Sequence, residues 1–285
     1  MEPFSLKIRG ERRTYTRPVV MGILNVTDDS FYSASRAMDS DAIAARVSTL
    51  IAEGADIIDI GGYSSRPGAV DISPGEELSR LACGMKALRA VAPDIPVSVD
   101  TFRAQVADIA VTELGCDIVN DISGTNLGGP EMVETMARLQ CPYILMHMRG
   151  TPADMQEHTE YIDVTADVLS ELGDRLQWLA MEGLDDIIID PGFGFSKTLE
   201  QNYRLMRELR CFQLFHRPVL VGISRKSMLT KLLNISTDDA LNSTTALNAM
   251  ALDRGAAILR VHDVAAARQA VDIYQAIEDD VPKAE

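Results

Sequence analysis

The stretch Asp186–Gly192 reads DIIIDPG and contains the pattern that decides the fold. Its three consecutive isoleucines form a short apolar run, which is typical of a strand buried on both faces in a parallel sheet. Asp190 ends the run, and Pro191 and Gly192 turn the chain away from it. The sequence contains eight such runs, and we expect strands at Val19–Val26, Asp56–Gly62, Pro96–Asp100, Cys116–Ser123, Tyr143–Met148, Asp186–Asp190, Val219–Ser224 and Ala256–Val261.

Segments with helical periodicity separate these runs. We expect helices at Asp41–Glu53, Glu76–Val91, Ala104–Leu114, Pro130–Leu139, Val164–Met181, Leu199–Leu209, Asp238–Asp253 and Ala265–Ile277, with capping signals at Ser40, Ser73 and Thr237. Eight strands that alternate with eight helices indicate an α/β protein, and the count favours a closed (β/α)8 TIM barrel over an open sheet. We expect a single domain over residues 1–285, in which residues 1–17 form an N-terminal hairpin or a plug under the barrel.

Composition excludes several classes of partner. The net charge of −15, from 27 basic and 42 acidic residues, disfavours non-specific binding to nucleic acid or to an anionic membrane. No apolar run is long enough to span a bilayer, and the polar N-terminus does not resemble a secretory signal. The four cysteines are widely spaced, as expected of reduced thiols. We therefore expect a cytoplasmic protein that acts on small molecules.

Polar residues follow nearly every predicted strand, and in a (β/α)8 barrel this end carries the catalytic groups. The acceptor groups are Asp100, Asn120 and Asp190, and the positive groups are Arg66, Lys226, Arg260 and His262. Any one of them could be polar only because the chain leaves the core there. Together they indicate a site for a neutral heterocycle that carries phosphate, with a second, acidic substrate. A Mg²⁺ ion carried by a diphosphate needs few protein ligands, so the lack of a metal-binding motif is no objection.

Eight motifs at these positions resemble those of the bacterial dihydropteroate synthases, a family of pterin-binding TIM-barrel enzymes. The resemblance extends from about Met21 to the end of the eighth strand. The motifs are Met21–Thr27, Ser65–Ala69, Ser98–Thr101, Asn120–Gly124, Met146–Pro152, Asp190–Phe195, Gly222–Ser227 and Arg260–Val264. The resemblance implies a transferase of folate biosynthesis that joins 6-hydroxymethyl-7,8-dihydropterin diphosphate to 4-aminobenzoate and releases pyrophosphate. It also implies a homodimer and a sulfonamide target.

The resemblance also implies a role for each matching residue. The pterin would be bound by Asp100, Asn120, Met146, Asp190, Phe195, Lys226 and Arg260. The diphosphate would be bound by Asn25, Arg66, Arg260 and His262, with Mg²⁺ held through Asn25. The 4-aminobenzoate would be bound by Phe31, Ser65, Pro67, Phe195, Lys226 and Ser227. The catalytic groups would be Asp100, Lys226, Arg260 and His262.

The sequence departs from the family pattern in two loops and after the sixth strand. In the first loop Asp28 replaces Pro, and Tyr32, Ser33, Ala34 and Ser35 replace a Ser-Asp-Gly-Gly sequence. Tyr63 stands where Glu is common, Ser65 replaces Thr, and Ser196 replaces Gly. Two alternatives follow: a paralogue that binds pterin without turnover, and a pterin-dependent methyltransferase domain. Neither would release pyrophosphate.

Overall fold

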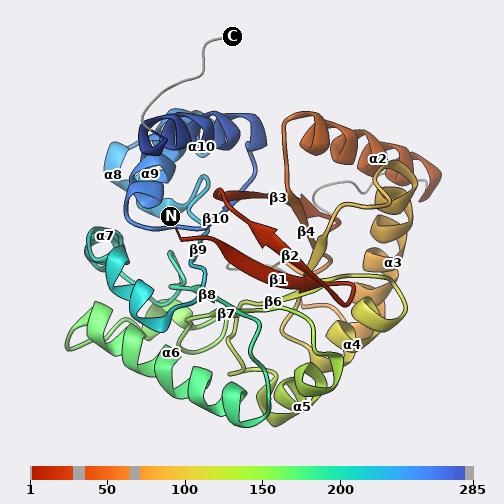
Figure 1. Ribbon diagram of the computed structural model, residues 1–285, viewed down its shortest axis with the longest axis horizontal. Helices are drawn as coiled ribbons and strands as arrows, with labels where there is room; N and C mark the ends of the chain where they lie inside the picture. Colours follow the sequence, from red (N-terminus) through yellow and green to blue (C-terminus); the bar gives the residue numbers. More distant parts are fainter. Residues whose placement is uncertain (1, 28–35, 65–70, 280–285) are drawn as a thin grey trace.

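The central feature of the fold is a parallel sheet that closes into a barrel (Figure 1). The computed structural model describes residues 2–27, 36–64 and 71–279. The strands pair in the order β8-β7-β6-β5-β4-β3-β10-β9, and a parallel bridge between Ile189 and Val219 joins the two edges. The strands are β3 (Val19–Asn25), β4 (Ile57–Gly61), β5 (Val97–Asp100), β6 (Ile118–Asp121), β7 (Tyr143–Met146), β8 (Ile187–Asp190), β9 (Leu220–Val221) and β10 (Ile258–Val261). All eight predicted strands and the TIM-barrel fold are confirmed.

A ring of helices surrounds the barrel (Figure 1). The helices are α2 (Arg36–Ala52), α3 (Pro74–Val91), α4 (Ala104–Thr112), α5 (Gly129–Leu139), α6 (Val164–Met181), α7 (Leu199–Arg207), α8 (Ser227–Leu233), α9 (Leu241–Asp253) and α10 (Val264–Glu278). The eight predicted helices are present, and α8 is a short additional one. None of the helices in the described part of the chain is long and apolar enough to cross a membrane.

Helix caps show where local sequence fixes a boundary. Ser73 caps α3 as predicted, because its Oγ accepts a hydrogen bond from the Glu76 amide at 3.2 Å. The other two predicted caps are wrong. Ser40 lies inside α2, and Thr237 has helical backbone angles and makes no side-chain capping bond. Thr198 caps α7 through a reciprocal capping box with Gln201, which the sequence prediction did not include.

The N-terminal segment forms the predicted hairpin and plugs the barrel. Strands β1 (Phe4–Ile8) and β2 (Glu11–Tyr15) pair antiparallel and lie across the amino-terminal end of the barrel strands (Figure 1). Leu6 and Ile8 belong to one buried cluster with residues at the beginnings of the strands, including Val19 and Ile57. The hairpin therefore closes the end of the barrel opposite to the predicted active site.

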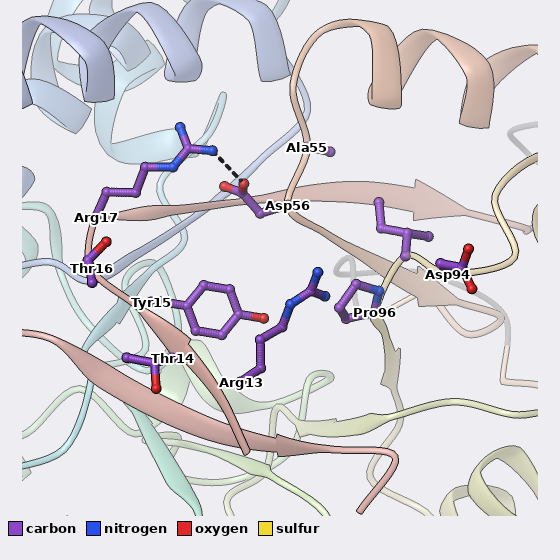
Figure 2. Close-up of a pocket in the computed structure, with 10 residues that line it drawn as sticks. Arg13, Thr14, Tyr15, Thr16, Arg17, Ala55, Asp56, Asp94 and Pro96 are labelled. Carbon is purple, nitrogen blue, oxygen red and sulfur yellow. Dashed lines mark hydrogen bonds and ion pairs between the residues drawn. The ribbon is translucent and has the colours of Figure 1, made fainter. Parts of the chain in front are cut away.

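A cavity of about 420 Å³ lies beside this hairpin (Figure 2). Asp56 lines the cavity and contacts three parts of the chain. Its carboxylate accepts hydrogen bonds from Arg17 Nη2 at 3.1 Å and from the Val20 amide at 2.9 Å. It also forms an ion pair with Arg268 on α10. These contacts attach the hairpin to the start of β3. Arg17 and Asp56 therefore have a structural role at the amino-terminal end of the barrel.

Candidate active site

The register of the sheet brings the predicted site residues of neighbouring strands side by side. Asn25 on β3 is paired with Gly61 on β4, Gly61 with Asp100 on β5, and Asp100 with Asn120 on β6. On the next two strands, Met146 on β7 is paired with Asp190 on β8, two residues beyond the row that contains Asn120. Because parallel strands all end on the same side, these side chains share the carboxyl-terminal rim.

Arg260 on β10 links two carboxylates inside this rim. Its Nη2 lies 2.6 Å from Asp59 Oδ2 and 2.6 Å from Asp100 Oδ2, and its Nε lies 2.7 Å from the same Asp59 oxygen. Asn120 Nδ2 donates to that oxygen as well, at 3.2 Å. Asp59 is fully buried, and its Oδ1 has no hydrogen-bond partner among the described residues. Asp59 thus contacts Asn120 and Arg260, two of the residues predicted to bind the pterin, and Arg260 extends the connection to Asp100.

Asp59 was missed by the sequence prediction, although a signal was present. It is the single carboxylate within the apolar run Ile57–Ile60, and a charge in a fully buried strand requires a partner. That partner is Arg260, which lies 201 residues further along the chain. The local pattern of apolar and polar residues gives no indication of such a distant pairing.

Burial changes the proton affinity of the groups at this rim. It raises the pKa of the Asp100 carboxyl, an effect that the nearby Arg260 opposes. It also raises the pKa of Asp190, opposed mainly by Lys226. Burial lowers the pKa of Lys226 to about 8, opposed by Asp190. The site therefore holds acceptors and cations that are only weakly hydrated, and a ligand with complementary hydrogen-bonding groups can compete well for them.

Lys226 and Phe195 form the second part of the site. Lys226 Nζ donates to the Phe193 carbonyl at 2.5 Å and lies 4.6 Å from the centre of the Phe195 ring. Phe195 packs against an apolar cluster that contains Met146. The structure thus brings together Met146, Phe195 and Lys226 from the predicted site.

The remaining predicted residues lie beside β9 and β10. His262 follows β10, where its backbone amide and its Nδ1 lie 3.2 Å and 3.0 Å from Ser224 Oγ. The loops after these strands are joined by a bidentate ion pair in which Arg225 Nε and Nη2 lie 2.8 Å and 2.9 Å from the carboxylate oxygens of Asp263. Ser227 is exposed at the start of α8.

Four predicted site residues lie outside the described residues: Phe31, Ser65, Arg66 and Pro67. The altered first-loop positions Asp28, Ser33, Ala34 and Ser35 lie outside them as well. Within the described part of the chain, no group of three or more His, Cys, Asp or Glu side chains is arranged to hold a metal. The amide oxygen of Asn25 lies at this rim, 3.7 Å from the position of a Cβ atom added to Gly61.

Comparison with known proteins identifies the family. Residues 21–262 match the pterin binding enzyme family. Over 261 residues the chain is 40% identical to the dihydropteroate synthase of Haemophilus influenzae, covering 91% of this chain and 94% of that protein. The chain belongs to the dihydropteroate synthase family. The family resemblance of the eight sequence motifs is thereby confirmed.

Two solved dihydropteroate synthase structures from Xanthomonas albilineans are similar to this one. The structure with 4-aminobenzoic acid has a TM-score of 0.88 and 38% sequence identity, and the alignment covers 98% of this chain and 99% of that chain. The complex with 7,8-dihydropteroate has a TM-score of 0.85 and 35% identity, with 98% and 100% coverage. The similarity to synthases thus extends over nearly the whole barrel, including the N-terminal hairpin.

Proposed function

We propose that this chain is an active dihydropteroate synthase, which condenses 6-hydroxymethyl-7,8-dihydropterin diphosphate with 4-aminobenzoate and releases pyrophosphate. The observation that supports this most directly is the convergence of Asp100, Asn120 and Asp190 with Lys226 and Arg260 at one barrel rim. A pterin ring presents several N–H groups along one edge, and these carboxylates and the amide are suitable acceptors for them. Met146 and Phe195 would pack beside the ring.

The diphosphate would lie next to the pterin, against Asn25, Arg260 and His262. Arg66 would join them from outside the described residues. A Mg²⁺ ion held by the Asn25 amide oxygen and the substrate diphosphate fits a donor set of one neutral oxygen, because Mg²⁺ usually keeps several waters and binds substrate phosphates. When bound, the metal would help to neutralise negative charge on the leaving diphosphate.

The residues of the rim supply the rest of the mechanism. The bond between the pterin methylene carbon and the diphosphate oxygen breaks, and its electron pair leaves with the diphosphate. Arg260 and His262 stabilise that charge, while Asp100 and Asp190 stabilise the electron-poor pterin. The amine nitrogen of 4-aminobenzoate then bonds to the methylene carbon and loses a proton. No covalent enzyme intermediate is required.

The 4-aminobenzoate ring would lie beside Phe195, with its carboxylate directed to Lys226 and Ser227. The short distance between Lys226 and the Phe195 ring supports this assignment, because a cation beside an aromatic face can serve both the ring and its carboxylate. Phe31, Ser65 and Pro67 would complete this pocket from the two loops that the sequence analysis singled out.

The decisive experiment is pyrophosphate release by the purified protein with dihydropterin diphosphate and Mg²⁺, with and without 4-aminobenzoate. Release that depends on 4-aminobenzoate, with dihydropteroate as the product, would establish the function. Absence of release while the pterin still binds would contradict the synthase function, would favour one of the two alternatives, and would direct attention to Ser33–Ser35. A matched Asp100→Asn variant controls for contaminating phosphatase activity.

We also infer that the single-domain protein acts as a cytoplasmic homodimer. Helices α9 and α10 pack against each other on the outside of the barrel (Figure 1) and carry exposed apolar side chains at Leu241, Met250, Ile273 and Ile277. Exposed apolar residues on adjacent helices are typical of association surfaces. Light scattering of the wild type and of Met250→Glu tests the interface. A monomeric wild type would exclude the homodimer. All four cysteines are free thiols, as is usual in the cytoplasm.

A further inference from the structure

A second group of buried polar residues lies directly behind the active site, and the proposed mechanism does not use it. Lys197 is only 3% exposed, and its Nζ contacts His147 Nδ1 at 3.0 Å. His147 is fully buried at the end of β7, and its Nε2 lies 3.0 Å from Glu171 Oε2 on α6. Glu171 also accepts from Arg149 Nε at 2.9 Å. His147 thus connects the buried Lys197 to the ion pair between Glu171 and Arg149.

The hydrogen bonds fit a charged lysine beside a neutral histidine, while burial lowers the pKa of Lys197 to about 7. The three protons of the Lys197 ammonium have three acceptors: His147 Nδ1, the Gly192 carbonyl at 3.0 Å and the Phe195 carbonyl at 3.1 Å. His147 is therefore neutral, accepting at Nδ1 and donating from Nε2 to Glu171. Burial, reinforced by the charge of Lys197, lowers the pKa of His147 to about 3, which agrees with this assignment.

Ser196 replaces the usual glycine of the family. It precedes Lys197 in the chain and contacts Arg149, so the network of Lys197, His147, Glu171 and Arg149 forms a closed ring. Its backbone has a φ of +46°, in the left-handed region that favours glycine. Its buried hydroxyl accepts a hydrogen bond from the Arg149 amide at 3.0 Å and lies 3.3 Å from Tyr161 Oη. The Arg149 guanidinium in turn lies 3.9 Å from the centre of the Tyr161 ring. The loops after β7 and β8 are therefore fastened to each other on two sides.

This ring holds the segment of chain that carries the Lys226 contacts. Lys197 binds the carbonyls on either side of Phe193, at Gly192 and Phe195, and Phe193 supplies the carbonyl that accepts from Lys226. The approach is close, because a Cβ atom added to Gly194 would lie 3.1 Å from Lys226 Cδ. A shift of this loop would therefore move both the Phe195 ring and the ammonium of Lys226.

We propose that Lys197, held in place by His147 and Glu171, is a positioning residue for the second substrate. It fixes the loop from Pro191 to Phe195 so that Phe195 and Lys226 meet 4-aminobenzoate. This inference rests on the assignment of these two residues to 4-aminobenzoate under the proposed function. Phe195 and Lys226 are assigned to the pterin as well, but the pterin also has the acceptors Asp100, Asn120 and Asp190, which are carried by strands, so the network affects the pterin less.

The test compares Lys197→Met with Lys86→Met, an exposed lysine on α3 that controls for the loss of charge. We expect Lys197→Met to raise the KM for 4-aminobenzoate by roughly ten- to a hundredfold, since small misplacements near reacting groups have effects of this size. The KM for the pterin diphosphate should change much less, and Lys86→Met should resemble the wild type. A loss of stability with both KM values unchanged, or an equal rise in both, would overturn the proposal.

Equilibrium binding tests the positioning role of Lys197 without turnover. Pteroic acid carries both the pterin and the aminobenzoate groups, whereas 6-hydroxymethylpterin carries the pterin alone. Lys197→Met should weaken the binding of pteroic acid much more than that of 6-hydroxymethylpterin, which keeps its strand-borne acceptors. An inactive wild type that still shows this difference would contradict the proposed function and retain the positioning role. An active wild type with no difference would contradict the positioning role alone.

A pair of variants at His147 separates positioning from general stability. Gln can accept from Lys197 through its amide oxygen and donate to Glu171 through its amide nitrogen, whereas Leu can do neither. We expect His147→Gln to retain a near-normal KM for 4-aminobenzoate and His147→Leu to reproduce the effect of Lys197→Met. Equal behaviour of the two variants would show that the network does not act through its hydrogen bonds.

Discussion

Arg260 on β10 and Asp59 on β4 form a buried ion pair across the barrel rim, in which Nε and Nη2 of the arginine lie 2.7 Å and 2.6 Å from a single carboxylate oxygen. Asp59 is inaccessible to solvent, whereas the Arg260 side chain is 20% exposed. The same guanidinium reaches Asp100, so Asp59 holds Arg260 in place from below while Asp100 faces the site. Asp59 therefore orients the cation that we assign to the diphosphate, while it is itself inaccessible to solvent.

We expect Asp59→Asn to destabilise the protein, because the substitution leaves part of the Arg260 charge without its buried partner. Breaking a buried pair costs about 3 kcal/mol of the free energy of unfolding. Urea denaturation measures this change. Asp253→Asn provides the control, because its ion pair with Arg210 is exposed on both sides and pairs of that kind contribute about 0–1 kcal/mol. Similar losses in the two variants would show that Asp59 has no special role.

Asp100→Asn should reduce turnover far more than stability. Burial already raises the pKa of this carboxyl, so a neutral side chain of the same shape is well tolerated by the fold. Loss of its negative charge removes stabilisation of the electron-poor pterin, and we expect kcat to fall roughly a hundredfold. Steady-state kinetics and thermal unfolding on the same preparation measure the losses of turnover and of stability. A variant that merely unfolds would identify Asp100 as a structural residue.

Lys226→Ala should weaken the binding of both substrates, because this ammonium lies between the Asp190 region and the Phe195 ring. Hydrogen bonds to charged groups contribute about 1.5–3 kcal/mol, which corresponds to a loss of roughly ten- to a hundredfold in each affinity. Calorimetric titration with each ligand measures the two effects. Lys231→Ala, at an exposed position on the same helix, is the matched control. Unchanged affinities would remove Lys226 from the site.

The fold could be predicted from sequence because strands buried on both faces produce apolar runs that are easy to locate. The runs at Ile187–Asp190 and Ile57–Gly61 also identified the rim, since polar residues follow where the chain leaves the barrel. The predicted cap at Ser40 failed because α2 begins before it, at Arg36. Helix ends depend on tertiary packing as well as on local capping preferences.

The network behind the site could not be predicted for a different reason. Lys197 and His147 are separated by 50 positions, and their contact depends on how two loops pack against each other. Neither residue stands out in the sequence, because a lysine after a glycine-rich loop is normally exposed. The left-handed backbone of Ser196, where the family usually has glycine, is the one local signal in this region. The resemblance of motifs thus predicts candidate site residues, but it does not predict the long-range contacts that surround them.

The titration of His147 provides a final prediction about acid stability. The pKa of this histidine falls from 6.5 to about 3 on folding, so the unfolded state binds the additional proton between these two values. Stability should therefore decrease as the pH falls from 6.5 towards 3. Hydrogen bonds from His147 and Arg149 overcome the effect of partial burial and lower the pKa of Glu171 from 4.5 to about 2, so the contribution of Glu171 is lost only below pH 4.5.

Between pH 6.5 and 4.5 the pH dependence of stability consequently reports on His147 without a contribution from Glu171. His147→Gln retains the hydrogen bonds but cannot titrate, so its melting temperature should decline less steeply than that of the wild type over this interval. The buried carboxyls with raised pKa, such as Asp100 and Asp190, have the opposite effect and are present in both proteins, so they cancel in the comparison. Thermal unfolding at half-unit steps of pH measures the two slopes. Parallel curves would mean that His147 is already protonated in the folded protein, in which case it could not accept a hydrogen bond from Lys197.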